Sequence, residues 1–521
     1  MPIEPSAPAP VALRPHPVYT TLQPVWEKLA HAVEGTGGFL DGGYLIAHPR
    51  EWLDHTAETP TKPTKKLKER RQLARYEHWP RTIISLLSGG LFRQPPVRRV
   101  GDPAAATPHP LAVWWEDVDG HGTDIDTFLR TAWDAAATFG HVFLLFDRPA
   151  QTAPTAADAR APYLRLYSPL DVPDWLTDDA GMLTAVRLLE GVPRETFDGQ
   201  DGTQIRDVTV DGWSVVMRQA DGRLDPATQT RGTHDYAGAL PVVILYGNRP
   251  MLSPVVGQSV LGDPKVIQDH YNLVSEHREL LRKQTFAMLN VPLGTGPDAV
   301  QVDQAQAMLG QVSGTANVAF TPLAASFLSP DKANVDAYAE ERERLERTMF
   351  RLAGLPWEAD SRAAEAADSR RIKREDLNQT LATYADYVQA ADLSIAELWY
   401  RAAYGAQWQT RWEADDVTIA YPDTFDSEVI DDTLARVQLA IALRLGKTAE
   451  ATLRKKVVSK LLSDEPPTVL QAADAEIDAM PDPEEVRAEQ RSAMVDAFRR
   501  QSPPASEAEP DEDDADEAAD A

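Results

Sequence analysis

The sequence predicts an α+β protein, and three observations indicate this class. Short apolar runs separated by turns rich in Pro, Gly and Asp occupy the first half of the chain, as is typical of strands. Segments with apolar residues every three or four positions occupy the second half, as is typical of amphipathic helices. The chain has 521 residues, of which 43% are hydrophobic. It is therefore long enough for about three domains of roughly 150 residues with a sizeable core.

Composition excludes several classes of site. The chain contains no cysteine, which excludes disulfides, thiolate zinc sites and cysteine nucleophiles and fits a reducing cytoplasm. The first residues lack the basic and apolar parts of a secretion signal. The longest apolar runs include 142–146 and 242–246, and both are far shorter than the roughly 18 residues of a membrane span. We therefore expect neither secretion nor a membrane partner.

The formal net charge of -28 gives the protein an acidic surface. Such a surface favours solubility and repels nucleic acid. An acidic lining is also an advantage where DNA must pass through a protein without sticking to it. The composition is compatible with both interpretations.

The first half begins with a Pro- and Ala-rich stretch, residues 1–18, which we expect to be disordered or loosely docked. A helical segment interrupted near Pro80 follows, and its first part carries Lys62, Lys65, Lys66, Lys68, Arg70, Arg71 and Arg75. A solvated helix face is the simpler interpretation of these residues, and a contact with nucleic acid or an acidic neighbour is the alternative. Thr123 then opens a helix that Gly140 closes. The expected strands are 141–147, 163–167, 182–189, 205–210, 213–218 and 242–246.

Helices dominate the second half. One spans 264–288 and another spans 333–353, and Gly354-Leu355-Pro356 stops the second. Two candidate strands, 317–321 and 325–329, lie between them. Apolar residues then alternate steps of four and three, which predicts a helix over 370–404 of about 35 residues and roughly 50 Å. The last expected elements are a strand at 416–421, helices at 427–445, 449–463, 468–479 and 483–500, and a disordered acidic tail after Arg500.

The usual catalytic motifs are incomplete. Leu445-Gly446-Lys447-Thr448 resembles the end of a phosphate-binding loop, but Ile441 replaces the required upstream glycine, so a helix C-cap explains Gly446 better. The stretch 257–261 lacks the final glycine of a nucleophile elbow. The 11 histidines show no ligand spacing. Carboxylates are too numerous for any pair to stand out. We therefore expect no enzyme activity, no metal and no cofactor.

Asp117, Asp119 and Asp124 lie in a glycine-containing loop that is similar to a calcium-binding loop. His121 stands where a third oxygen ligand belongs, and Phe128 stands where the bidentate glutamate belongs, so an EF-hand is excluded. The better interpretation is a turn followed by a helix N-cap, with a weak cation site as the alternative.

The helix expected over 333–353 is densely charged. Its acidic and basic residues on several faces are Glu340, Glu341, Arg342, Glu343, Arg344, Glu346 and Arg347. Exposed ion pairs contribute little one at a time. Repeated around a closed ring, Glu of one subunit paired with Arg of the next would fix the register between neighbours. A solvated amphipathic helix explains the periodicity equally well.

In their order along the chain, these elements resemble the portal (head–tail connector) proteins of tailed bacteriophages, most closely those with an extended N-terminal region. Four stretches carry the resemblance. They are RTIISLLSGGLFRQPP at 81–96 followed by DVDGHGT at 117–123; FGHVFLLFD at 139–147; APYLRLYSP at 161–169 leading to VPDW at 172–175; and the helix–strands–helix–loop–long-helix series from 264 to 404. None of them is a catalytic fingerprint, and their order carries the likeness.

The resemblance implies a portal fold with wing, two-helix stem, small clip, tunnel loop and helical C-terminal crown. The implied parts are a flexible N-terminus (1–18), the wing (19–260), a stem helix (261–288), the clip (289–332), a second stem helix (333–354), the tunnel loop (355–369), a long wing helix with a return strand (370–426), the crown (427–500) and a disordered acidic tail (501–521). The tail has no obvious counterpart in the family.

The resemblance also implies roles for particular residues. The DNA tunnel would be lined by Trp357, Glu358, Asp360, Arg362, Glu365 and Asp368, and the seven charged residues of the second stem helix would contact the neighbouring subunit. The tunnel segment is rich in Ala and acidic residues, so no single residue is assigned to gripping DNA.

The implied function is that of a non-catalytic ring at one capsid vertex, through which DNA is packaged and ejected. The implied partners are further copies of the chain in a dodecamer, double-stranded DNA in the channel, the terminase large subunit, a neck or adaptor protein and the major capsid protein. The implied location is the virion, after assembly in the host cytoplasm. ATP hydrolysis would belong to the terminase.

Two other classes of protein remain compatible with the sequence. Another virion structural protein, such as a minor head protein, shares the charge but does not require two stem helices around a clip. A hydrolase with a site built from scattered carboxylates predicts a deep pocket within one subunit and activity in a monomer.

Overall fold

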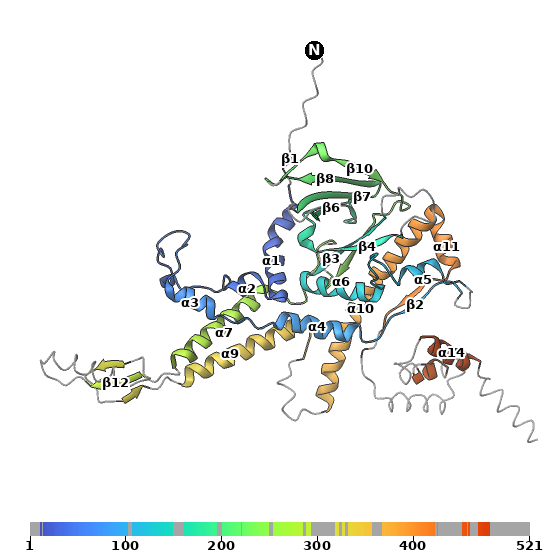
Figure 1. Ribbon diagram of the computed structural model, residues 1–521. Helices are drawn as coiled ribbons and strands as arrows, with labels where there is room; N and C mark the ends of the chain where they lie inside the picture. The colour runs from blue at the N-terminus through green and yellow to red at the C-terminus, as the bar shows by residue number, and fades with distance from the viewer. Residues whose placement is uncertain are drawn as a thin grey trace, which may run out of the picture. The chain divides into compact units, whose positions relative to one another are not determined.

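The computed structural model describes residues 11–12, 14–102, 107–148, 161–194, 201–219, 221–249, 254–284, 288–292, 318–321, 326–328, 332–356, 367–422, 425, 451–455, 457–458 and 467–479. The chain divides into two compact units, residues 1–425 and residues 426–521, and each is described by itself. The first unit mixes helices with several antiparallel sheets (Figure 1), which confirms the predicted α+β class.

The N-terminal part of the first unit is mainly helical. Its helices are α1 (Pro17–Glu34), α2 (Gly37–Asp41), η1 (Pro49–Glu51), α3 (Lys65–Leu73), α4 (Trp79–Leu91), α5 (Pro110–Trp114) and α6 (Ile125–Phe139). The expected interruption near Pro80 falls between α3 and α4, and Pro80 lies in the first turn of α4, where its missing N–H is not needed.

The sequence did not predict helix α1, and the residue that caps α6 differs from the expected one. α1 begins at Pro17, where His16 Nδ1 accepts a hydrogen bond from the Val18 N–H, and β1 (Val11–Ala12) pairs with β9 (Arg223–Leu224). These contacts fall within the stretch 1–18 that was expected to be loose. Asp124, not Thr123, caps α6, because its carboxylate accepts a hydrogen bond from the Thr127 N–H at 2.9 Å.

Two sheets follow, one with the strand order β1-β9-β8-β7-β6-β5 and β10 paired to β8, and one with the order β11-β3-β4. Their further strands are β3 (His141–Asp147), β4 (Tyr163–Tyr167), β5 (Asp174–Thr177), β6 (Leu183–Val192), β7 (Gly202–Thr209), β8 (Gly212–Arg218), β9 (Arg223–Leu224), β10 (Thr230–Thr233) and β11 (Val242–Tyr246), with short turns of 3-10 helix at η3 (Pro169–Asp171) and η4 (Pro226–Thr228). All six expected strands are confirmed. The sequence did not predict β5, β9 and β10.

Strand β3 lies between two hydrophobic cores. All seven of its residues are buried. Val142, Leu144 and Phe146 belong to a core that includes residues of α6 and of a later helix, α10. Phe143 and Leu145 belong to a second core with Trp26 and Trp175 among its members. Because successive side chains of a strand point to opposite faces, the continuous apolar run at 142–146 serves both cores.

The second half of this unit contains α7 (Pro264–Gln284), β12 (Met288–Pro292), β13 (Val318–Thr321), β14 (Ser326–Leu328), α9 (Lys332–Leu352), α10 (Ala367–Tyr404), η6 (Gly405–Gln407), α11 (Trp408–Ala414) and β15 (Thr418–Ala420). The expected helices and strands are confirmed with small shifts. One boundary was wrong, because α7 ends at Gln284 and Met288 opens β12, which pairs in parallel with β13 and antiparallel with β14. The sequence also missed α11.

Strand β15 pairs antiparallel with β2 (Val97–Arg99), which lies more than 300 residues earlier in the sequence. The end of the first unit is therefore tied back to the segment that follows α4.

In the second unit, α14 (Pro467–Asp478) agrees with the helix expected over 468–479, and residues 451–455 are helical within the expected 449–463. Lys455 Nζ lies 2.6 Å from Asp478 Oδ2, so these two segments contact one another. The helices expected over 427–445 and 483–500, and the tail after Arg500, lie outside the described residues. Of the helices that the structure describes, none has the length and apolar character to cross a membrane.

Candidate functional site

Helices α7 and α9 pack side by side and antiparallel (Figure 1), and α9 carries the seven charged residues that the sequence singled out. His270 faces Glu346 near one end of the pair, and His277 stacks on Tyr338 further along, with ring centroids 5.8 Å apart. The buried apolar residues between the helices and the body are Ile267, Tyr271, Val274, Leu345, Met349 and Phe350. Their spacing of three, four and seven is the one that predicted the helices.

A polar cluster, which we call the His270 cluster, lies where α7, α9 and the segment before α4 meet. It consists of Glu77, His270, Arg342 and Glu346. His270 Nε2 lies 3.2 Å from Glu346 Oε1 and 3.7 Å from Glu77 Oε2. Arg342 Nε donates to the same Glu346 oxygen at 2.8 Å, and the Trp79 indole N–H donates to Glu77 Oε2 at 3.2 Å. Among the described residues, Glu77, His270 and Glu346 form the only group of three His and carboxylate side chains whose ligand atoms lie close enough together to hold a metal ion.

The His270 cluster has an unusual charge environment. His270 and Glu346 are only 2% and 6% exposed. Burial by itself raises the pKa of Glu346, but hydrogen bonds from His270 and Arg342 outweigh burial, so the pKa lies below its ordinary value. The sequence did not reveal this cluster. The sequence offered one sign of it, because His270 lies on the same apolar helix face as Ile267 and Val274. A histidine at such a position is more often an ordinary core residue.

The seven charged residues of α9 separate into two groups. Arg342 and Glu346 belong to the His270 cluster and contact their own chain. Arg344 pairs with Glu341 at 2.6 Å, and Arg347 pairs with Glu343 at 3.2 Å, each within the helix. The side chains of these four residues are between 44% and 61% exposed, and Glu340 is also exposed. Glu340, Glu341, Glu343, Arg344 and Arg347 are thus available on the outer face of the helix.

The expected tunnel residues fall mostly outside the described part of the chain. Trp357, Glu358, Asp360, Arg362 and Glu365 are not among the described residues, and Asp368 lies in the first turn of α10. Their lining of a tunnel stays a prediction.

The basic segment around α3 proves to be partly structural. Arg70 is buried and pairs with Glu51 at 2.8 Å, and it also donates to the Ile46 carbonyl. The Arg71 guanidinium lies over the Trp52 ring at 5.5 Å. Lys65 and Lys66 face solvent, with side chains 90% and 60% exposed. The solvated face therefore accounts for the lysines, whereas the two arginines hold the segment 46–73 together.

The acidic loop before α6 is a turn. Asp117 Oδ1 accepts hydrogen bonds from the N–H groups of Gly120 and Gly122, at 2.8 and 2.9 Å. Asp119 Oδ1 accepts from the N–H groups of His121 and Thr123. These backbone bonds confirm the interpretation as a turn followed by a helix N-cap.

Ser259, in the stretch that lacks the elbow glycine, donates its hydroxyl to the Ala137 carbonyl at 3.2 Å. The segment 441–448 lies outside the described residues.

A second buried polar network, which we call the Arg98 network, joins four parts of the first unit. Arg98 on β2 contacts Asp126 on α6 at 2.7 Å, Asp392 on α10 at 2.8 Å and the Tyr421 hydroxyl at 3.1 Å. Asp392 is fully buried. Burial raises its pKa, and Arg98 opposes that rise only in part. Arg98 and Asp392 are buried and Asp126 reaches the surface, so the network ties β2 to α6 and α10, and we assign it a structural role.

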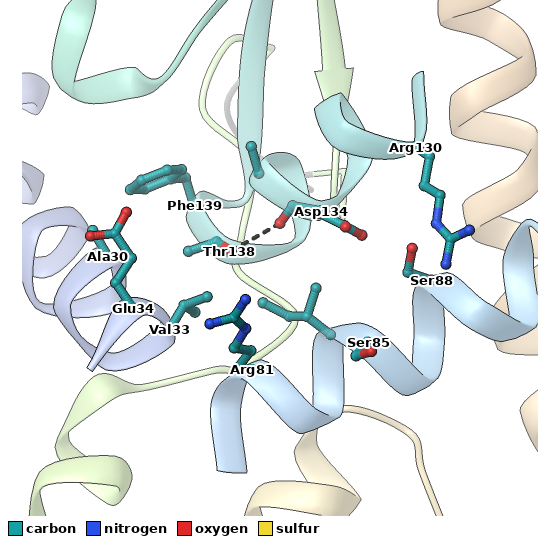
Figure 2. Close-up of a pocket in the computed structure, with 12 residues that line it drawn as sticks. Ala30, Val33, Glu34, Arg81, Ser85, Ser88, Arg130, Asp134, Thr138 and Phe139 are labelled. Atoms are coloured by element: carbon teal, nitrogen blue, oxygen red, sulfur yellow. Dashed lines mark hydrogen bonds between the residues drawn. The ribbon is translucent and has the colours of Figure 1, made fainter. Parts of the chain in front are cut away.

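A cavity of about 390 Å³ lies between α1, α4 and α6. Figure 2 shows Glu34 and Arg130 at opposite ends of it, with Arg81 between them and Asp134 beside Ser88. Burial raises the pKa of Asp134. Two arginines and two carboxylates balance one another, and no histidine lines the cavity. The four charged side chains of the lining, Glu34, Arg81, Arg130 and Asp134, have formal charges that sum to zero.

Comparison with known proteins gives weak similarities. No protein-family model matches the chain, and no curated protein matches it. Solved structures that are similar to it include the following two. One is described as the virion of a native gene transfer agent (GTA) particle, with 11% identity, 74% of this chain and 91% of that chain covered, and a TM-score of 0.34. The other is the neck of an empty GTA particle computed with C6 symmetry, with 11% identity, 70% and 86% covered, and a TM-score of 0.34. A TM-score of 0.34 is too low to show that either structure has the same fold as this chain.

Proposed function

We propose that this chain is a structural protein of a phage-type virion and, more specifically, its portal subunit. Copies of the chain would form a ring at one capsid vertex, through which DNA is packaged and later ejected. Terminase, neck or adaptor proteins and the major capsid protein would dock on the ring. The observation that carries the proposal is the arrangement of the second half, where two antiparallel helices, α7 and α9, bracket a small sheet and are followed by the 38-residue helix α10.

The outer face of α9 supports assembly into a ring. Its glutamates and arginines alternate, and their pairs within the helix leave both partners largely exposed. Such pairs contribute little to the stability of a single chain. A neighbouring copy that supplies the opposite charges would repeat the same contact around a closed ring, because a head-to-tail interface closes when the rotation between subunits divides a full turn.

The charge of the chain supports passive conduction of DNA. Binding of duplex DNA depends on Lys and Arg that replace the counterions of phosphate. A subunit with a net charge of -28 has little affinity of this kind, so DNA would slide past it. The segment 355–369, which follows α9 and includes the first residues of α10, would form the constriction. We assign ATP hydrolysis to the terminase, since the sequence contains no complete phosphate-binding loop.

Negative-stain microscopy of the purified full-length chain tests the proposal. We expect class averages down the particle axis to show rings, about twelve-fold, with a central hole near the width of duplex DNA. Monomers or closed particles at all salt and protein concentrations would reject the portal assignment and favour another virion component, such as a minor head protein. Hydrolysis of ATP by the purified chain alone would reject the assignment of that activity to the terminase.

A further inference from the structure

The His270 cluster brings together the ligand set of a metal site from three separate elements. We propose that Glu77, His270 and Glu346 bind a divalent transition metal, with Zn²⁺ as the preferred ion. The three residues come from the segment before α4, from α7 and from α9. A bound ion would join these elements at the base of the helix pair. This inference does not depend on the portal assignment.

The distances between the ligand atoms suit a small ion. His270 Nε2 lies 3.2 Å from Glu346 Oε1 and 3.7 Å from Glu77 Oε2, and all three atoms lie within 4.8 Å of one another. Zn²⁺ binds nitrogen and oxygen at about 2.0–2.2 Å with tetrahedral geometry, which places its ligand atoms about 3.3–3.5 Å apart. A small inward movement of Glu77 would complete this geometry. Glu77 has the most exposed side chain of the three, at 27%.

The charges of the cluster also favour a divalent ion. Two carboxylates surround one imidazole, and a ligating imidazole is neutral, so a 2+ ion would balance the ligands completely. Arg342 supplies only one positive charge to the same two carboxylates. Buried charges need such compensation, because they have lost their hydration. With a neutral His270, Arg342 alone leaves one negative charge of the two carboxylates uncompensated.

Arg342 is the competitor of the metal. Its guanidinium contacts the Glu346 oxygen that would bind the ion, but its side chain is 40% exposed and can turn toward solvent. That movement would open a fourth coordination position for water. The chemistry of the ligands also sets the preference among metals. Mg²⁺ and Ca²⁺ favour all-oxygen sites, whereas an imidazole with two carboxylates suits Zn²⁺ and its first-row neighbours.

Titration of the full-length chain with ZnCl₂, after treatment with a chelator, tests the proposal. We expect one Zn²⁺ per chain by calorimetry and a higher Tm with Zn²⁺ than with MgCl₂. His270→Gln should abolish both effects. Its matched control is His277→Gln, because His277 lies on the same helix and stacks on Tyr338 between the same two helices. This control should bind Zn²⁺ as the wild type does. Glu77→Gln serves as a second, less buried test in case His270→Gln does not fold.

Arg342→Met separates a metal site from a simple ion-pair cluster. If the proposal is correct, removal of the competing guanidinium lowers the Kd for Zn²⁺, and Co²⁺ in place of Zn²⁺ gives the visible absorption of a tetrahedral site. Absence of Zn²⁺ binding in both the wild type and Arg342→Met would overturn the proposal. So would a Zn²⁺ response that persists in His270→Gln and Glu77→Gln. Ring formation is measured separately by microscopy, so the failure of either proposal leaves the other intact.

Discussion

Arg98 and Asp392 lie 294 residues apart in the sequence and form a salt bridge of 2.8 Å in the core of the first unit. Asp392 is fully buried, and its second oxygen, Oδ1, has no hydrogen-bond partner among the described residues. Since Arg98 also contacts Asp126 and Tyr421, a single guanidinium connects β2, α6, α10 and the chain that follows β15.

Removal of the Arg98 side chain should strongly destabilise the protein. Arg98→Met leaves Asp392 as an uncompensated buried charge, which costs about 3–5 kcal/mol. Urea denaturation at pH 7 measures this loss. The double variant Arg98→Met/Asp392→Asn removes both charges, and we expect it to be more stable than Arg98→Met alone. Equal losses in the single and double variants would contradict the assigned role of the pair.

The loss of unfolding free energy in Arg98→Met should also depend on pH. The pKa of Asp392 is raised in the folded protein, so the folded state binds protons more readily than the unfolded state. Stability then falls as pH rises from the ordinary aspartate pKa of about 3.9 through the raised value. Without Arg98 the pKa rises further, so we expect a smaller deficit at pH 5 than at pH 7. A deficit that is constant over this range would show that Asp392 is not the cause.

Glu346 should make the opposite contribution. Its pKa is lowered in the folded protein from an ordinary value of 4.5. It therefore stabilises the fold above pH 4.5, and this stabilisation is lost as pH falls through the lower folded value. We expect Glu346→Gln to cost about 1–3 kcal/mol at pH 7, because His270 and Arg342 lose a charged acceptor. Below pH 4.5 the wild type should approach the variant, and parallel unfolding curves at all pH values would refute this assignment.

Reversal of charge on the outer face of α9 should prevent ring assembly without unfolding the chain. In Arg344→Glu/Arg347→Glu, both cations on this face become anions beside Glu341 and Glu343. We expect rings to disappear from negative-stain images and the circular dichroism spectrum to stay the same. Arg223→Glu, at an exposed position of strand β9 in the large sheet, is the control and should still form rings. Intact rings in the α9 variant would remove these residues from the proposed interface.

Two glycines with positive φ give a paired test of backbone packing. At Gly140 (φ +98°) an added Cβ would lie 2.5 Å from the Gly257 carbonyl oxygen, whereas at Gly120 (φ +76°) it would meet no atom within 4 Å. Gly120→Ala suffers only the cost of a left-handed alanine, about 1 kcal/mol. Gly140→Ala adds a backbone clash, and we expect a loss of about 3 kcal/mol. Thermal unfolding of the two variants provides the comparison.

The elements predicted best from sequence are those with a strong local pattern. Strands β3, β4 and β11 agree residue for residue with the apolar runs 141–147, 163–167 and 242–246. The error at the end of α7 has a local cause, because Met288 continues the helical spacing although it opens β12. The short strands β9 and β10 have too few residues for any period to be visible.

The polar clusters could not be predicted from sequence for a different reason. The partners of Arg98 lie 28, 294 and 323 residues away, so their meeting depends on the packing of several elements. The same is true of His270 and Glu346, which are 76 residues apart. The sequence predicted Glu346 as an exposed stem residue, but the register of α9 turns it toward α7, where it is 6% exposed.

The position of β3 between two hydrophobic cores has a consequence for local opening of the fold. Neither core can loosen without exposing one row of β3 side chains, and the strand is hydrogen-bonded on both edges, to β11 and β4. We therefore expect the two cores to unfold as one cooperative unit. The backbone amides of β3 should be among the slowest in the protein to exchange with deuterated solvent, at rates set by global unfolding.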